Sequence, residues 1–454
     1  MNTLSLVGRA TTLAVASLLT LLLAPFAAPA QDEAPSYLLI RNATLWDGKS
    51  DTATPGMNVL VENNLVSQIS AEPIVVNRSA DTTVIDAGGR TLMPGLIDMH
   101  THLMQRYGVS WMREADAQGM GAAAKEVMDR YMAMGYTTLR DVGGNSLGIA
   151  KEVLAGRVSG PRLYSSGGAI SAISGHYDVA LFTEDPHDNI FVDRGDAMII
   201  TGPIEAREAT RRLFRGGASQ IKIMVGGGVA SNFDPLESTT MSEDEIRAVV
   251  EAAADFGSYV CAHAYTDESV NRVLNAGGRC IEHGFLVSEE TVKRMKSLDA
   301  VMSLQTYAAV EVFKEPEKLA GFNAENVRKA RQVRDGARNM LNLVAKYDVD
   351  TLYGGDLWQD HLIEEAPKDM VLRREWFSDV EILRQNTSSA GRWLAKSGTK
   401  NPYREGPIGV IEVGAYADMI VVEGNPLEDV SVFVDYDNTI KVVIKDGEVY
   451  QNNL

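Results

Sequence analysis

Cysteine is nearly absent from this chain, with only Cys261 and Cys280 in 454 residues. Small exported domains that depend on disulfides are rich in cysteine, so a disulfide framework is excluded. Both cysteines lie in predicted neighbouring strands, and Cys261 shares a strand face with His263. Two buried free thiols are the expected state. A disulfide is the alternative, because the sequence does not give the Cα separation that a bridge requires.

Basic residues are also scarce. Lys and Arg number 43 against 61 Asp and Glu, which gives a formal net charge of −18. Proteins bind nucleic acid mainly through Lys and Arg contacts to phosphate, so nucleic acid is not an expected partner. The acidic balance bears on solubility and says little about the fold.

Long apolar runs are limited to the first thirty residues. Arg9 precedes the apolar run Leu13 to Leu23, and the small-residue motif Ala28-Pro29-Ala30 follows it. This order predicts a signal peptide over residues 1–30, cleaved after Ala30, and a periplasmic or secreted protein. The alternative is an uncleaved anchor, but the run is shorter than the about 20 residues that a membrane span needs. No stable membrane insertion is expected after cleavage.

The rest of the chain alternates apolar strands with helical stretches. With 45% apolar residues it has enough material for a large core. Residues 94–400 predict an α/β fold, a (β/α)₈ TIM-like barrel. A doubly wound sheet is the alternative, but no Gly-x-Gly-x-x-Gly follows a first strand. The expected strands are Leu96 to Leu103, Tyr136 to Val142, Arg162 to Ser166, Gln220 to Val225, Ser258 to Ala264, Arg279 to His283, Ala300 to Thr306 and Asp350 to Gly355.

Two helices of the barrel are predicted from their periodicity, Glu243 to Phe256 and Asp267 to Ala276. Ser242, with Glu245 three residues later, predicts a capping box at the start of the first. Short mixed strands recur at both ends of the chain, as in Tyr37 to Trp46 and Thr439 to Tyr450, where Asp446-Gly447 is a hairpin signal. Residues 31–93 and 401–454 are therefore expected to form one composite β-sandwich.

Side chains suited to metal binding occur where the predicted strands end. His100 and His102 are spaced i, i+2, which places both rings on one face of a strand. Neutral imidazoles and carboxylates are the ligands that zinc accepts. The barrel positions its chemistry at the C-terminal ends of its strands, so these side chains are expected to meet. The set is His100, His102, Lys222, His263, His283 and Asp356.

Lys222 is the unusual member of this set, because it lies between Ile221 and Ile223 in an apolar strand. A bare ammonium ion is costly to bury there. Carboxylation by CO₂ removes that cost, since a carbamate is an anion with two oxygens that bridges two divalent metals. A salt-bridged or snorkelling lysine is the alternative.

These motifs resemble the amidohydrolase superfamily, in the imidazolonepropionase-like branch with metal-dependent prolidases, Xaa-Arg carboxypeptidases and ochratoxin-hydrolysing amidases. The resemblance covers essentially the whole mature chain. It implies that His100, His102 and Asp356 hold one metal, that His263 and His283 hold the other, and that carboxylated Lys222 bridges them. Zinc fits these ligands. A homo-oligomer is expected from the relatives. The matching motifs are Pro94 to His102, Ile221 to Met224 with Gly226 to Gly228, Ala262-His263-Ala264, Ile281 to Gly284, Gly354-Gly355-Asp356, Gly409 to Gly414, Ala417-Asp418 and Gly424 to Leu427.

The resemblance also implies a mechanism, in which two metals lower the pKa of a bridging water toward about 7 and the resulting hydroxide attacks an amide carbonyl. Asp356 would accept the proton and deliver it to the leaving nitrogen. His176 or Tyr265 would donate a hydrogen bond to the oxyanion, or simply pack. Tyr265 departs from relatives that carry a second histidine at this place. The run Gly226 to Gly228 either lets the backbone approach the substrate or is a flexible loop.

The expected function is an exported amidohydrolase that cleaves an amide or peptide bond to a C-terminal amino acid, like a carboxypeptidase or dipeptidase. Its substrate is a small molecule or a dipeptide, and an ochratoxin-type N-acyl aromatic amino acid belongs to that class. Hydrolysis of a cyclic amide, lactone or phosphotriester is the alternative. A non-catalytic protein on the same scaffold is a third reading, but it gives no reason for a lysine inside an apolar strand.

Overall fold

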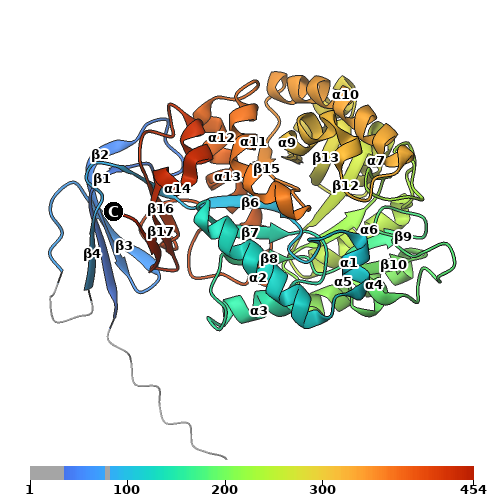
Figure 1. Cartoon of the computed structure of the whole chain (residues 1–454), viewed down its shortest axis with the longest axis horizontal. Coiled ribbons are helices and arrows are strands. Elements are labelled where there is room, and N and C mark those ends of the chain that lie inside the picture. The colour runs from blue at the N-terminus through green and yellow to red at the C-terminus, as the bar shows by residue number, and fades with distance from the viewer. Residues whose placement is uncertain (1–34, 77–81) are drawn as a thin grey trace, which may run out of the picture.

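The computed structural model describes residues 35–76 and 82–454. The predicted signal peptide, residues 1–30, lies outside the described residues. A large α/β barrel occupies one end of the molecule and a smaller β domain the other (Figure 1). In the described part of the chain, no helix has the length and apolarity that a membrane span requires.

The barrel confirms the predicted fold class and the eight predicted strands. The strands pair in parallel as β6–β7–β8 and as β11–β12–β13–β14–β15. The ring closes where the chain after β15 returns to β6, since the Asp356 amide donates to the His100 carbonyl at 2.9 Å. The bounds are β6 (Leu96–Thr101), β7 (Tyr136–Asp141), β8 (Arg162–Ser165), β11 (Ile221–Met224), β12 (Val260–Thr266), β13 (Cys280–Leu286), β14 (Val301–Leu304) and β15 (Thr351–Tyr353).

Two further strands were not predicted. β9 (Ala169–Ala172) follows β8 after Gly167, whose φ is 66°, and pairs with β11. The third barrel strand is therefore interrupted, and β8 contacts the start of β11 through the Ser219 amide and the Ser165 carbonyl, 2.9 Å apart. β10 (Ala197–Ile200) pairs with β9. Strands of four residues carry too little periodicity to be recognised in a sequence.

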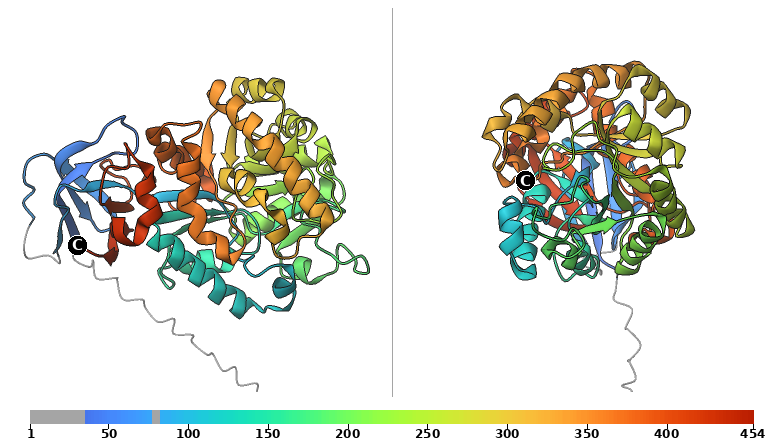
Figure 2. Two further views of the ribbon diagram at one scale, coloured as in Figure 1. Left: turned by 45° about the horizontal axis from the view of Figure 1, so that its top comes forward. Right: turned by 90° about the vertical axis from the view of Figure 1, so that its right-hand side faces the viewer.

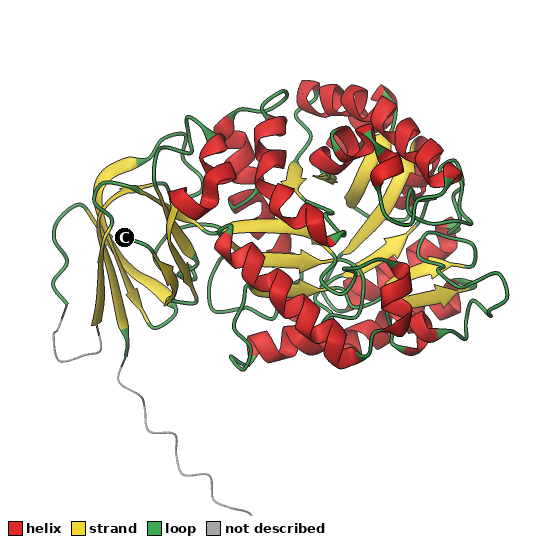
Figure 3. Ribbon diagram, in the orientation of Figure 1, coloured by secondary structure: helices red, strands yellow, loops and turns green. Residues whose placement is uncertain are grey.

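Helices cover the outside of the barrel (Figures 2 and 3). The predicted capping box is present, because the Ser242 side chain accepts from the Glu245 amide and the Glu245 carboxylate accepts from the Ser242 amide. The two predicted helices end within a residue of their expected positions. The helices are α1 (Val109–Glu114), α2 (Ala117–Ala133), α3 (Leu147–Leu154), α4 (Ile190–Asp193), α5 (Pro203–Gly216), α6 (Glu243–Asp255), α7 (Asp267–Asn275), α8 (Glu289–Ser297), α9 (Thr306–Val310), α10 (Ala324–Lys346), α11 (Ala366–Arg373), α12 (Asp379–Gln385), α13 (Ser388–Ala395) and α14 (Tyr436–Thr439).

Both ends of the chain build the β domain. β5 pairs antiparallel with β16, and this pairing joins the N-terminal strands to the C-terminal ones. Buried aliphatic side chains from both groups, such as Ile40 and Val421, share one core. The Asp446-Gly447 hairpin turn links β17 and β18 as predicted. The bounds are β1 (Tyr37–Leu45), β2 (Thr54–Glu62), β3 (Leu65–Ser70), β4 (Thr82–Asp86), β5 (Thr91–Pro94), β16 (Met419–Val422), β17 (Ile440–Lys445) and β18 (Glu448–Asn452).

A buried ionic cluster lies between the barrel and the β domain. Arg162, the first residue of β8, donates to the Asp418 carboxylate at 2.6 Å and to the Asp446 carboxylate at 2.5 Å. Its guanidinium lies 3.8 Å from the ring centroid of Tyr416 and 4.8 Å from that of Tyr403. We name Arg162, Asp418 and Asp446 the junction cluster. It fixes the N-terminal end of β8 against the β domain.

Candidate metal centre

The first and last barrel strands bring three of the predicted ligands together. His100 lies near the end of β6, His102 follows that strand, and Asp356 follows β15. Asp356 Oδ1 is 3.6 Å from His100 Nε2 and 3.2 Å from His102 Nε2. Gly354 makes this closeness feasible, because a Cβ there would lie 2.8 Å from His100 Cβ. The Gly-Gly-Asp motif therefore places a carboxylate against the His-x-His pair.

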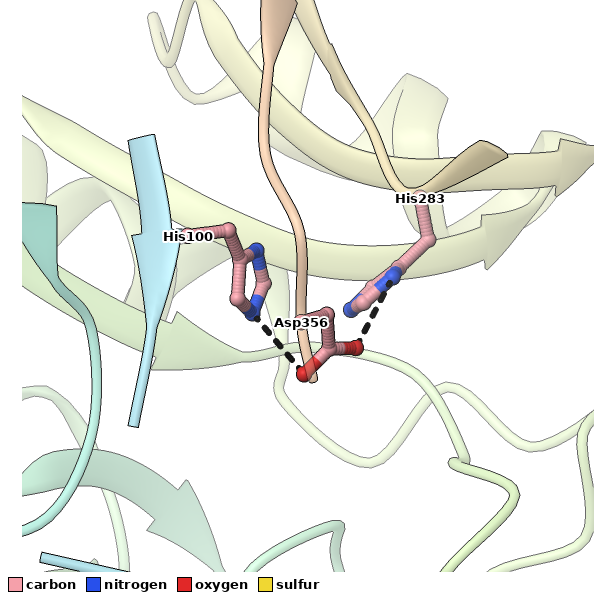
Figure 4. Close-up of side chains that lie close together, drawn as sticks. All are labelled: His100, His283 and Asp356. Atoms are coloured by element: carbon pink, nitrogen blue, oxygen red, sulfur yellow. Dashed lines mark ion pairs between the residues drawn. The ribbon is translucent and has the colours of Figure 1, made fainter. Parts of the chain in front are cut away.

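β12 and β13 contribute the other two histidines. The rings of His263 and His283 are 4.5 Å apart, and the rings of His283 and His100 are 5.1 Å apart. His283 Nδ1 lies 3.9 Å from Asp356 Oδ2 (Figure 4). His283 and Asp356 both have positive φ, 73° and 52°. Such backbone strain in non-glycine residues occurs at functional sites, and here it belongs to two predicted ligands.

Lys222 lies in β11 and is 1% exposed. In the part of the chain that the structure describes, no hydrogen bond or ion pair holds its ammonium group. Burial and the charge of Lys222 together lower the pKa of His100 to about 4. Burial is also the main reason why the pKa values of His263 and His283 fall well below their usual range. The site thus combines neutral imidazoles with an unpaired buried cation.

The donor atoms fit divalent metal ions. His100, His283 and Asp356 offer ligand atoms that lie within 4.8 Å of one another. Burial alone would raise the pKa of Asp356, but the three histidines around it hold that pKa well below its usual range, so the carboxylate is charged. Neutral nitrogen donors beside an anionic oxygen donor are what zinc and similar cations bind.

Hydrogen bonds to the distal nitrogens assign which ring atoms face the site. His100 Nδ1 lies 2.7 Å from Glu282 Oε2, and His263 Nε2 lies 3.1 Å from the Gly227 carbonyl. A ring nitrogen that donates to an oxygen leaves the other nitrogen with a free lone pair. These partners leave His100 Nε2 and His263 Nδ1 available as ligands.

The buried Arg140–Glu282 ion pair that holds His100 was not identified from the sequence. Arg140 of β7 donates to Glu282 Oε1 at 2.5 Å, and both side chains are fully buried. Burial would raise the pKa of Glu282, but Arg140 and His100 hold it well below its usual range. The only signal for Glu282 was its position before His283 in the Ile-Glu-His-Gly motif. Strand alternation argued against it, because neighbouring residues of a strand point to opposite faces.

His176 and Tyr265, the two candidate donors to the oxyanion, each contact a histidine that is a predicted ligand. The His176 ring stacks on His263 with centroids 4.2 Å apart, and the Tyr265 ring stacks on His283 at 5.1 Å. Burial raises the pKa of Tyr265 well above its usual value, which keeps its hydroxyl protonated and able to donate. Gly228, in the predicted glycine run, leaves room for the His176 ring, because a Cβ on Gly228 would lie 2.1 Å from His176 Nδ1. Neither substrate approach nor loop flexibility is needed to explain that glycine.

Two buried polar atoms beside the site lack partners among the described residues, His102 Nδ1 and the Tyr177 hydroxyl. Both lie close to Gly143, where a Cβ would be 3.2 Å from the first atom and 2.6 Å from the second. Buried polar groups are normally paired, so an unpaired group at a site is typical of one that meets a ligand or an ordered water. Tyr177 was not singled out in the sequence, since only its contacts distinguish it.

Known proteins are similar to this chain in fold and in sequence. A solved amidohydrolase structure is 31% identical and superposes with a TM-score of 0.85, covering 92% of this chain and all of its own. A prolidase solved with N-methylphosphonate-L-proline is 30% identical, with a TM-score of 0.84 and the same coverage. Ochratoxinase of Aspergillus niger is 25% identical over 415 residues, which are 87% of this chain and 82% of that enzyme.

The predicted ligand types, the barrel and these likenesses point to one enzyme class, hydrolases that act on carbon-nitrogen bonds and depend on metal. The model of the amidohydrolase family matches residues 91–450, which include every residue of the candidate metal centre. This chain belongs to the amidohydrolase family.

Proposed function

We propose that the chain is an exported, periplasmic or secreted, binuclear amidohydrolase that cleaves an amide or peptide bond to a C-terminal amino acid. The observation that carries the proposal is the unpaired Lys222 ammonium, 1% exposed, among the neutral histidines of the candidate centre. A carbamate on Lys222 would replace the unpaired cation by an anion that holds two metal ions. Zinc suits the nitrogen-rich ligand set.

The predicted ligands divide into two groups. His100, His102 and Asp356 would hold one ion, His263 and His283 the other, and carboxylated Lys222 both. Divalent cations at such a site lower the pKa of water and polarise a carbonyl oxygen. Asp356, charged and a fifth exposed, is placed to accept a proton and return it to the leaving nitrogen. Tyr265 keeps a protonated hydroxyl for the developing oxyanion.

The substrate class follows from the relatives named above, a prolidase and an ochratoxinase. The first is a prolidase solved with a proline-containing phosphonate, and the second is named for ochratoxin. We therefore propose dipeptides and N-acyl amino acids, with an ochratoxin-type aromatic amide within that class.

The test combines metal analysis of the purified mature protein with a screen of dipeptides and N-acyl amino acids. We expect about two divalent ions per chain, hydrolysis of members of this class, and loss of hydrolysis on chelation that returns with added zinc. Lactones, cyclic amides and phosphotriesters serve as the comparison set. Full activity in a demonstrably metal-free sample, or turnover confined to the comparison set, would contradict the proposal.

A further inference from the structure

We propose that Asp234, Ser231 and Lys329 form a buried relay that holds His176 above the metal centre, with its Nδ1 protonated and its Nε2 directed to the substrate. The inference deepens the proposed function and rests on it. It assigns positioning residues to the loop after β11 and to α10, which the sequence did not connect to the site.

The first step of the relay is between His176 and the loop. His176 Nδ1 lies 2.6 Å from Ser231 Oγ and 3.4 Å from Asp234 Oδ2. The Ser231 hydroxyl itself donates to Asp234 Oδ2 at 2.6 Å. A hydroxyl has a single proton, so Ser231 accepts from His176 while it donates to the carboxylate. This arrangement places a proton on His176 Nδ1.

The second step ties the loop to α10. The Lys329 ammonium, 1% exposed, donates to the carbonyls of Gly228, Ser231 and Asp234 at 2.9, 3.0 and 2.7 Å, which uses all three of its protons. It also lies 3.6 Å from Asp234 Oδ1. Asn326, one turn earlier in α10, donates to the Ser231 carbonyl at 3.0 Å. Helix α10 therefore holds the loop backbone and places the Lys329 ammonium beside the Asp234 carboxylate.

The relay leaves little freedom for His176. Asp234 Oδ2 also accepts from the Gly228 amide at 2.7 Å, so the same carboxylate binds the residue that contacts the imidazole. The His176 ring lies parallel to His263, with 23° between the ring planes. Nε2 has no protein partner among the residues that the structure describes, and the side chain is 16% exposed. One ring edge is thus hydrogen-bonded to the relay, and the other has no partner among the described residues.

The assigned tautomer changes the role expected for His176. In the tautomer that carries its proton on Nδ1, imidazole presents Nε2 as a hydrogen-bond acceptor. His176 then accepts a hydrogen bond from the substrate, and Tyr265 is left as the donor to the oxyanion. Burying a Lys–Asp pair for packing alone gains little over apolar residues, whereas the hydrogen bonds that Asp234 Oδ2 accepts from Ser231 and from the Gly228 amide hold the loop in one geometry.

Nitrogen-15 NMR of histidine tests the relay directly, because the chain has only seven histidines and His176→Gln assigns one of them. We expect the Nδ1-protonated tautomer for His176 in the metal-free and in the zinc-loaded chain. Asp234→Asn and Ser231→Ala should both shift its resonances toward a mixture of tautomers. Glu237→Gln, an exposed carboxylate of the same loop, is the matched control and should leave them unchanged.

Turnover supplies the second readout. We expect Asp234→Asn to reduce kcat about 10- to 100-fold at unchanged metal content, as is typical when the partner that orients a site histidine is lost. In the His176→Gln background the same substitution should have little further effect, since its action passes through His176. Gly228→Ala should displace the ring, whereas Gly226→Ala, whose Cβ would have no neighbour closer than 3.3 Å, should not.

An Nε2-protonated tautomer in the wild type, or unchanged His176 resonances in both Asp234→Asn and Ser231→Ala, would overturn the relay. Additive losses of turnover in the double variant would overturn it as well. The NMR readout needs neither substrate nor activity, so failure of the proposed function would leave it intact. Lys329→Met, with the exposed Arg328→Met as its control, keeps the test decisive if an Asp234 variant does not fold.

Discussion

The ionic groups at the two ends of the barrel strands differ in whether they have ion-pair partners within the chain. At the N-terminal end, the junction cluster pairs Arg162 with Asp418 and Asp446 and stacks it on two tyrosines. At the C-terminal end, Lys222 has no ion-pair partner in the described chain, and His102 Nδ1 and the Tyr177 hydroxyl have no hydrogen-bond partners there. The contrast between the two clusters is therefore that the Arg162–Asp418 ion pair is complete within the described chain, whereas Lys222 has no ion-pair partner there.

The physical reason for the difference is the cost of burying charge. A buried ion without partners is expensive, whereas a buried ion that is paired and hydrogen-bonded costs far less. The junction cluster is complete within the chain and so contributes stability and geometry. At the candidate metal centre Lys222 has no ion-pair partner among the described residues, and the proposed carbamate and metal ions would supply it. Three substitutions, from the largest expected effect to the smallest, test this contrast.

Lys222→Ala removes the proposed bridge between the metal ions, so turnover should fall to the level of the metal-free chain, with reduced metal content. Short-chain carboxylic acids should restore part of the activity by filling the vacated space. Metal analysis and initial rates measure both effects. Lys293→Ala on the exposed face of α8 is the control. An unmodified Lys222 side chain in an active, metal-loaded crystal would count against the carbamate.

Asp356→Asn separates proton transfer from metal binding. An amide oxygen still coordinates, so much of the metal should remain, but the acceptor for the proton is lost. We expect kcat to fall by about 10²- to 10⁴-fold, the usual contribution of a general base. The limb of the pH-rate profile that reports this base should change as well. If Asp356 were only a turn residue, the melting temperature would fall while turnover in the folded protein stayed nearly normal.

Arg162→Met should lower stability and leave turnover nearly unchanged, the reverse of the two substitutions above. Removing one partner of a buried ion pair typically costs about 3–5 kcal/mol, so the free energy of unfolding should fall by that order while kcat in the folded fraction is retained. Chemical denaturation and initial rates on one preparation measure both. Arg157→Met, which removes an exposed arginine paired with Glu152, is the control. A large loss of kcat at normal stability would break the contrast between the two regions.

Arg162→Met should also change how the free energy of unfolding depends on pH. Burial would raise the pKa of Asp446, but Arg162 holds it below its usual value. A carboxylate with a lowered folded pKa stabilises the fold above its unfolded pKa, and that contribution is lost as the pH falls through the folded pKa. The stability difference between wild type and Arg162→Met should therefore be largest near neutral pH and shrink in acid.

Local sequence patterns determined much of this protein. Apolar strands alternating with helices predicted the barrel, and the eight strands lie where that pattern placed them. The ligand candidates were found because His, Lys and Asp are rare within apolar strands and follow motifs of fixed spacing. Ser242 and Glu245 marked a helix start, and Asp446-Gly447 marked a hairpin, since caps and turns depend on neighbouring residues.

Only the tertiary structure decided which distant side chains complete the site. Arg140 and Glu282 are 142 residues apart in the chain, Lys329 and Asp234 are 95 apart, and Ser231 and His176 are 55 apart. Each looks ordinary in its own segment, because lysine in a helix and aspartate before proline are common surface residues. Their roles arise from the closure of the barrel, which brings strand ends and the following loops together. The sequence thus determined which ionisable side chains are available, and long-range packing determined which of them are paired with one another.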